Sequence, residues 1–156
     1  MSLSAPKSQA IDGAAFSIGI VAACFNPELV DALLARVTAG LRAAGVPARR
    51  ITLVRVPGSH EVPWAAQALA REGCDCVVGL GVLIGGDTSH HELVGRSVSH
   101  ALQRVALDAR TPVINGVIVA DTRAQAAARC RGKVNRGAEF AAAALAMAAL
   151  KRKLSR

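Results

Sequence analysis

The residues best suited to chemistry stand in one short stretch, GVLIGGDTSHHELV, at residues 81–94. An apolar run ends there in Gly85 and Gly86, and glycines allow a backbone to approach a ligand closely. Residues 87–89 follow as Asp-Thr-Ser, three residue types that commonly cap the start of a helix. Because the free N–H groups of a helix start attract phosphate, the stretch predicts an anion site or, equally, an ordinary capped helix.

Two histidines, His90 and His91, follow at neighbouring positions. Successive side chains on a helix point roughly 100° apart, so we expect only one of the two to face a site. Metal-binding helices usually space their ligands three or four residues apart, and for this reason we predict no metal here. A single histidine beside an anion site can move protons near neutral pH.

Composition limits the partners that such a site could have. The chain has 156 residues, 52% of them hydrophobic, which suits one domain with a substantial core. Its net charge of +8 favours anionic partners. Aromatic residues make up only 3%, too few to stack on single-stranded nucleic acid, so small phosphorylated molecules are the better expectation.

The remaining composition favours a cytoplasmic protein. No apolar segment reaches the roughly 18 residues of a membrane span, and the first residues lack the apolar centre of a signal peptide. The four cysteines follow no recognised disulfide or metal framework, and we expect reduced, mostly buried thiols.

The elements that must position these residues alternate along the chain. Apolar β-branched runs predict strands at 16–23, 51–56, 76–84 and 112–120. Helical periodicity predicts helices at 27–45, 64–72, 92–109, 123–130 and 136–154, with residues 57–63 as a turn. We therefore expect a flavodoxin-like, doubly wound α/β sandwich whose four-stranded parallel sheet is flanked by helices. A flexible segment, 1–13, would precede a single domain at 14–156.

In such sheets, ligands bind outside the carboxyl ends of the strands. Phe25 follows the first predicted strand, residues 58–61 follow the second, and residues 85–90 follow the third. The chemically interesting side chains therefore fall on one edge of the predicted sheet. Purely structural alternatives stay open for single residues. Phe25 could belong to the hydrophobic core, and Glu61 could be an acidic residue that stabilises the start of a helix.

Five segments of the chain resemble lumazine synthases in order and spacing. The resemblance runs from about residue 16 to residue 150, and its V-P-G-x-x-E-[IV]-P and G-x-T-x-H elements are specific when taken together. The five segments read CFN, VPGSHEVPWAAQAL, LGVLIGGDTSHHELV, PVINGVIVADTRAQAAAR and NRGAEFAAAALAM.

The resemblance implies a condensation without metal or redox cofactor. The family joins 5-amino-6-(D-ribitylamino)uracil to 3,4-dihydroxy-2-butanone 4-phosphate, which gives 6,7-dimethyl-8-(D-ribityl)lumazine, phosphate and water. An amine attacks a ketone to form a Schiff base, phosphate leaves, and ring closure follows. Each step moves protons, which a histidine can carry.

The resemblance also implies a role for each matching residue. His90 is implied to be the proton carrier, oriented by Glu139 across an interface. Asp87, Thr88 and Arg129 are implied to lie at the phosphate, with the Asp87 carboxylate capping the helix and pointing away. The residues implied to hold the pyrimidine and its ribityl chain are Phe25, Ser59, His60, Glu61, Val82, Leu83, Ile84 and Asn115.

Several positions depart from the family pattern. His60 stands where an aromatic or apolar residue is usual, Gly85 where many members have arginine, and Asn115 where phenylalanine is common. His60 and Asn115 favour an alternative, a paralogue that binds lumazine or a flavin without making it. Retention of His90 and Arg129 favours the enzyme, because a pure binder needs no proton carrier.

Family members share their sites between the subunits of a pentamer, and some stack pentamers into larger bodies. The resemblance therefore implies a homo-oligomer, with small-molecule substrates and neither nucleic acid nor membrane as a partner. The number of subunits stays open.

Overall fold

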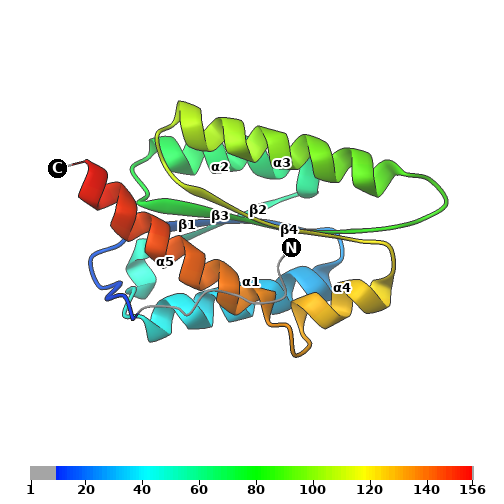
Figure 1. Cartoon of the computed structure of the whole chain (residues 1–156), viewed down its shortest axis with the longest axis horizontal. Coiled ribbons are helices and arrows are strands. Elements are labelled where there is room, and N and C mark those ends of the chain that lie inside the picture. The colour runs from blue at the N-terminus through cyan, green and yellow to red at the C-terminus, as the bar shows by residue number, and fades with distance from the viewer. Residues whose placement is uncertain (1–9, 156) are drawn as a thin grey trace.

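The computed structural model describes residues 10–155, which form one four-stranded parallel sheet between two layers of helices (Figure 1). The strand order is β2-β1-β3-β4, and the expected flavodoxin-like α/β fold is confirmed. The strands are β1 (Ile18–Ala23), β2 (Ile51–Val56), β3 (Cys76–Ile84) and β4 (Val113–Ala120). The predicted flexible segment, 1–13, falls largely on residues 1–9, which lie outside the described part of the chain.

Five helices cover the sheet. Helices α2 (Val62–Arg71) and α3 (His90–Asp108) lie on one face (Figure 1). Helices α1 (Pro27–Ala43), α4 (Arg123–Cys130) and α5 (Arg136–Leu154) lie on the other face. Short 3₁₀ helices, η1 (Ala48–Arg50) and η2 (Ser59–Glu61), precede and follow β2.

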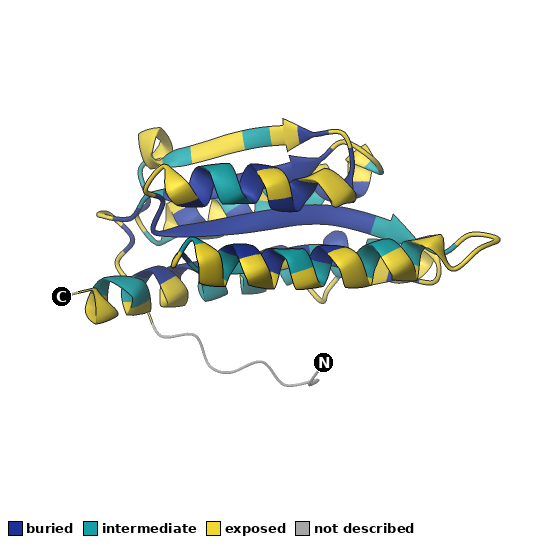
Figure 2. Ribbon diagram, turned by 90° about the horizontal axis from the view of Figure 1, so that it is seen from above, coloured by how far each residue is buried: buried dark blue, intermediate teal, exposed yellow. Residues whose placement is uncertain are grey.

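The two central strands carry most of the core. All six residues of β1 are buried, and so are the first seven of β3 (Figure 2). The register aligns Ile18 of β1 with Ile51 on one side and with Cys76 on the other. Strands buried on both faces have near-continuous apolar sequences, which explains why these two were readable from sequence.

Two helices begin earlier than the sequence patterns predict. Helix α2 starts at Val62 instead of Trp64, because Pro63 occupies the first turn, where a proline costs no hydrogen bond. Helix α3 starts at His90 instead of Glu92, so both neighbouring histidines belong to its first turn. The predicted turn at residues 57–63 therefore contains a 3₁₀ helix and the beginning of α2.

An ion pair fixes α5 to the end of the sheet opposite the predicted site. Arg152 donates two hydrogen bonds to the Asp75 carboxylate, both at 2.7 Å, and the Ser17 N–H donates a third at 2.8 Å. The Arg152 guanidinium also lies 5.1 Å from the centre of the Phe16 ring. Burial by itself would raise the pKa of Asp75, but these hydrogen bonds outweigh it and hold the pKa below its ordinary value.

Within residues 10–155, none of the helices combines the length and the apolar character that crossing a membrane requires.

Candidate active site

A cavity of about 460 Å³ opens at the carboxyl ends of β1, β2 and β3. Nine of the thirteen residues predicted for the site are in its wall, although they come from separate parts of the chain. These nine are Phe25, Ser59, His60, Glu61, Val82, Leu83, Ile84, Thr88 and His90. The predicted clustering on one edge of the sheet is therefore observed.

The inner wall of the cavity is formed where η2 crosses β3. Ser59 is 4% exposed, and its hydroxyl has no hydrogen-bond partner within residues 10–155. A buried polar group without a partner costs free energy, about 1–3 kcal/mol, unless a ligand or water satisfies it. The Ser59 hydroxyl is therefore placed to bond a polar ligand.

Two hydrogen bonds shape the segments around this wall. The Gly58 N–H donates to Oε2 of Glu61 at 2.9 Å, which closes the 3₁₀ turn that carries Ser59 and His60. The Asn26 side chain donates to the Val82 carbonyl at 2.9 Å and so connects the end of β1 to the end of β3. Asn26 is in the left-handed conformation, which asparagine tolerates better than most residues.

The aromatic side of the cavity is open. Phe25 has 71% of its surface exposed, and its ring lies over Gly58. The alternative that Phe25 belongs to the core is therefore wrong. A large exposed aromatic ring beside a cavity offers a flat apolar face to a ring-shaped ligand.

The loop between β3 and α3 extends beyond the end of the sheet (Figures 1 and 2). The Gly85 N–H donates to the Ala120 carbonyl at 2.8 Å, and a Cβ at Gly85 would lie 2.6 Å from the Asp121 carbonyl oxygen. A side chain at this position would therefore require the backbone to move. The close approach of the two backbones therefore requires a glycine at position 85.

The expected capping of α3 by Asp87 is wrong. Ser89 occupies the N-cap position, and no side chain caps the helix there. Asp87 lies two residues before that position and does not line the cavity. The free N–H groups of the first turn are consequently available to an anion.

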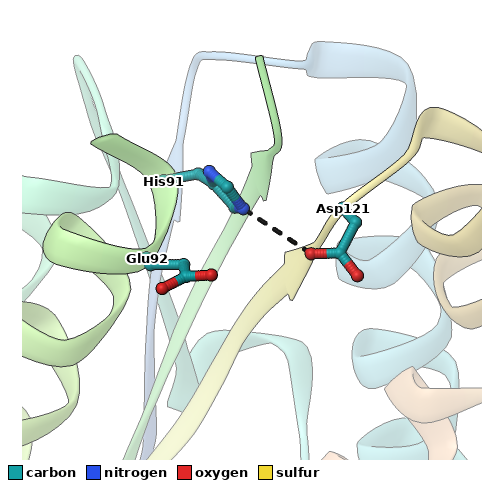
Figure 3. A group of neighbouring side chains, drawn as sticks. All are labelled: His91, Glu92 and Asp121. Carbon is teal, nitrogen blue, oxygen red and sulfur yellow. Dashed lines mark ion pairs between the residues drawn. The ribbon is translucent and has the colours of Figure 1, made fainter. Parts of the chain in front are cut away.

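The expectation that only one of the two histidines faces the cavity is also wrong. Both His90 and His91 line it. His90 is exposed, whereas the His91 side chain is only 12% exposed and points toward Asp121, which follows β4 (Figure 3). The two side chains diverge from the helix, yet both border the same cavity.

One group of side chains in the described part of the chain has a composition that could hold a metal. Ligand atoms of His91, Glu92 and Asp121 lie within 4.8 Å of one another (Figure 3). Two features oppose a cation there. The positive end of the α3 dipole lies beside the group, and Glu92 already pairs with Arg96 at 3.6 Å. The prediction that no metal binds stays a prediction.

Four predicted residues lie away from the cavity wall described within residues 10–155: Asp87, Asn115, Arg129 and Glu139. Asn115 lies exposed on the edge strand β4, where its side chain accepts the Val117 N–H at 3.1 Å. Arg129 donates to the Gln125 carbonyl within α4 at 2.9 Å, and Glu139 pairs with Arg136 within α5. A site that uses Asn115, Arg129 and Glu139 would need them from another copy of the chain.

Asn26 and His91 belong to the cavity wall but were not among the residues predicted from sequence. An asparagine immediately before the helix-starting Pro27 was a usable signal for Asn26. His91 had no such signal, because its position depends on where α3 begins and on Asp121, which lies 30 residues further along the chain.

The cysteines behave as expected, with one exception to burial. All four are free, and Cys74, Cys76 and Cys130 are buried, but Cys24 is exposed. Burial raises the pKa of Cys76 to about 12 and that of Cys130 to about 11. These thiols are inert core residues.

The fold and the cavity together define an α/β protein with a cavity at the carboxyl edge of its parallel sheet, the place where such sheets bind ligands. Comparison with known proteins identifies the family. The profile described as "6,7-dimethyl-8-ribityllumazine synthase" matches residues 15–152.

Curated relatives with that same name match most of the chain. A relative from Cupriavidus metallidurans is 43% identical over 141 residues, 90% of this chain and 82% of the relative. One from Mycolicibacterium vanbaalenii is 42% identical over 153 residues, 96% of both chains. One from Pyrococcus furiosus is 39% identical over 142 residues, 91% of this chain and 89% of the relative. The chain belongs to the 6,7-dimethyl-8-ribityllumazine synthase family, which confirms the resemblance and the expectation of a transferase.

Proposed function

We propose that the protein condenses 5-amino-6-(D-ribitylamino)uracil with 3,4-dihydroxy-2-butanone 4-phosphate to form 6,7-dimethyl-8-(D-ribityl)lumazine. The observation that carries the proposal is the joining of nine predicted site residues in one cavity of about 460 Å³. The unpartnered, buried hydroxyl of Ser59 in the wall supports a ligand rich in hydrogen-bonding groups.

The two ends of the cavity suit the two substrates. The Phe25 ring and the apolar side chains of β3 suit the flat pyrimidine, while Ser59 and its neighbours on η2 offer polar groups to the ribityl chain. The free N–H groups at the start of α3, beside Thr88, suit the phosphate. No cofactor is required by this arrangement.

His90 would move protons between these two ends. The amine of the pyrimidine attacks the ketone, and the resulting Schiff base loses phosphate before the ring closes. A histidine at this position can take the proton from the attacking amine and supply protons to the departing water and phosphate. In the single chain His90 is exposed, so a further wall is needed to exclude water.

We infer that a second subunit of a homo-oligomer, a pentamer or an assembly of pentamers, supplies that wall. Arg129, Glu139 and Asn115 would come from this neighbour to meet the phosphate, His90 and the pyrimidine. Large apolar side chains beside the opening support an interface, since Phe25 is 71% exposed and Leu93 is 68% exposed.

A second candidate, a paralogue that binds lumazine or a flavin without making it, rests on His60 and Asn115. His60 lines the cavity at a position where an aromatic or apolar residue is usual in the family, so the contact with the pyrimidine would be more polar.

The test mixes the purified protein with both substrates and follows the absorbance of the lumazine product. Because the substrates also react slowly by themselves, only the excess over a protein-free mixture counts. We expect a clear excess that His90→Ala reduces about a hundredfold. His100→Ala, on the exposed side of the same helix, is the matched control and should retain wild-type turnover. No excess together with tight binding of lumazine would establish the paralogue instead.

A further inference from the structure

The His91 side chain is nearly buried, yet neither of its ring nitrogens has a hydrogen-bond partner within residues 10–155. Its Nε2 atom lies 3.7 Å from Oδ1 of Asp121, a separation that allows an ion pair but is too long for a strong hydrogen bond (Figure 3). The pair joins the first turn of α3 to the junction between β4 and α4.

We propose that His91 is a positioning residue for the reaction: paired with Asp121, it holds the first turn of α3, and with it His90, against the ends of β3 and β4. The effect of His91 on turnover rests on the proposed function, whereas the effect of His91 on the structure of the loop before α3 does not.

The loop before α3 has few other attachments. Gly86 has no atoms of other residues within 4 Å of where its Cβ would be, and Ser89 gives the helix no side-chain cap. Upstream, the Gly85 N–H is bonded to the Ala120 carbonyl. Among the hydrogen bonds and ion pairs of residues 10–155, the His91–Asp121 contact is the next one after Gly85 that joins this part of the chain to another element. Between the two lie Thr88, implied for the phosphate, and His90, implied for the protons.

Two carboxylates lie beside the His91 ring. Asp121 faces it from the end of β4, and Glu92 from α3 itself. Glu92 shares its charge with Arg96 at 3.6 Å. His90 is the neighbouring residue, and His60 and Glu61 of η2 border the same cavity.

Two substitutions separate this role from simple packing. His91→Phe fills the same space but cannot pair, and Asp121→Asn keeps the shape of its partner without the charge. His100→Phe is a matched histidine control on the exposed side of α3. Asp108→Asn is the matched carboxylate control, since Asp108 pairs with Arg104 on the same helix at 2.9 Å.

The experiment measures kcat and KM and, in parallel, amide hydrogen exchange of residues 86–92. We expect both variants to lower kcat about tenfold, because a displaced His90 is misaligned, with less than about a twofold change in the KM for the pyrimidine. Amides of residues 88–90 should exchange faster in the same variants. The controls should match the wild type.

Other outcomes overturn the proposal. A loss in His91→Phe without a loss in Asp121→Asn would mean that His91 only packs, and unchanged kcat with unchanged exchange would mean that it does nothing for His90. Loss of wild-type activity in a chelator, restored by Zn²⁺ but not in Asp121→Asn, would make the group a cation site. If the wild type shows no turnover but the loop still exchanges faster in both variants than in the wild type, the positioning contact is supported and the proposed reaction is disproved.

Discussion

The hydroxyl oxygen of Ser59 lies so close to Gly81 that a Cβ atom at Gly81 would approach it to 2.3 Å. The contact joins η2, which follows β2, to the middle of β3. Ser59 lines the cavity, and its hydroxyl has no hydrogen-bond partner within residues 10–155. The absence of a side chain at residue 81 is therefore a condition for the shape of the site.

Gly81→Ala should destabilise the protein by about 2 kcal/mol, because an added methyl group in a tightly packed contact forces the backbone or Ser59 to move. Urea unfolding measures the loss. Gly86→Ala is the matched control, since a Cβ at Gly86 would enter open space and should change the free energy of unfolding little. Adding Ser59→Gly to Gly81→Ala should recover stability, and a double variant as unstable as Gly81→Ala would show that Ser59 is not the obstacle.

A site shared between subunits predicts that two inactive variants can repair each other. His90→Ala and Arg129→Ala should each abolish most turnover as pure proteins. After the two are unfolded together and refolded in equal amounts, about one quarter of the sites should combine an intact His90 with an intact Arg129. Steady-state turnover should then recover to about one quarter of the wild-type rate.

In the control, His90→Ala is unfolded and refolded in the same way with the double variant His90→Ala/Arg129→Ala. This mixture should stay inactive, because none of its subunits has an intact His90. If the pure Arg129→Ala protein is as active as wild type, Arg129 does not act on the phosphate. If the mixture stays inactive although both variants assemble, the two residues serve the same subunit.

The ion pair between Asp75 and Arg152 predicts a dependence of stability on pH. The folded state holds the pKa of Asp75 below its ordinary value of 3.8. A depressed carboxyl pKa contributes stability that is present above the ordinary value and is lost as the pH falls through the folded one. The free energy of unfolding should therefore fall in acid, below about pH 4.

Arg152→Ala should cost about 2 kcal/mol at pH 7, since it removes two hydrogen bonds from a nearly buried carboxylate. The cost should be smaller at pH 3, and urea unfolding at both pH values measures the difference. Arg104→Ala removes an exposed pair and serves as the control. An equal cost of Arg152→Ala at both pH values would assign its contribution to packing on Phe16.

The cysteines predict a simple labelling pattern. Cys24 is exposed, whereas burial raises the pKa of Cys74, Cys76 and Cys130 and makes their thiolates rare. A thiol reagent at pH 8 should modify one cysteine per native chain, and Cys24→Ser should abolish this reaction. All four should react in denaturant. A native chain whose Cys24 does not react would indicate that another subunit covers it.

Local patterns determined most of the fold. Strands β2 and β3 and helices α4 and α5 have the predicted bounds, because their apolar periodicity and helix signals lie within the elements themselves. Because the carboxyl ends of parallel strands meet at one edge of a sheet, the predicted strand ends were enough to place Phe25, Ser59 and Thr88 at that edge. The start of α3 was missed, because cap-forming residues stood at 87, 88 and 89 and only packing selects among them.

Only the tertiary structure decided which histidine is enclosed and which is exposed. The pairing of His91 with Asp121 and the close contact of Ser59 with Gly81 both join residues far apart in the sequence. Neither leaves a local pattern, because each depends on how two elements cross at the edge of the sheet. The sequence by itself determined the family and the fold class, and it predicted which edge of the sheet carries the chemistry. The folded chain decided the distances there, because distances between side chains depend on packing.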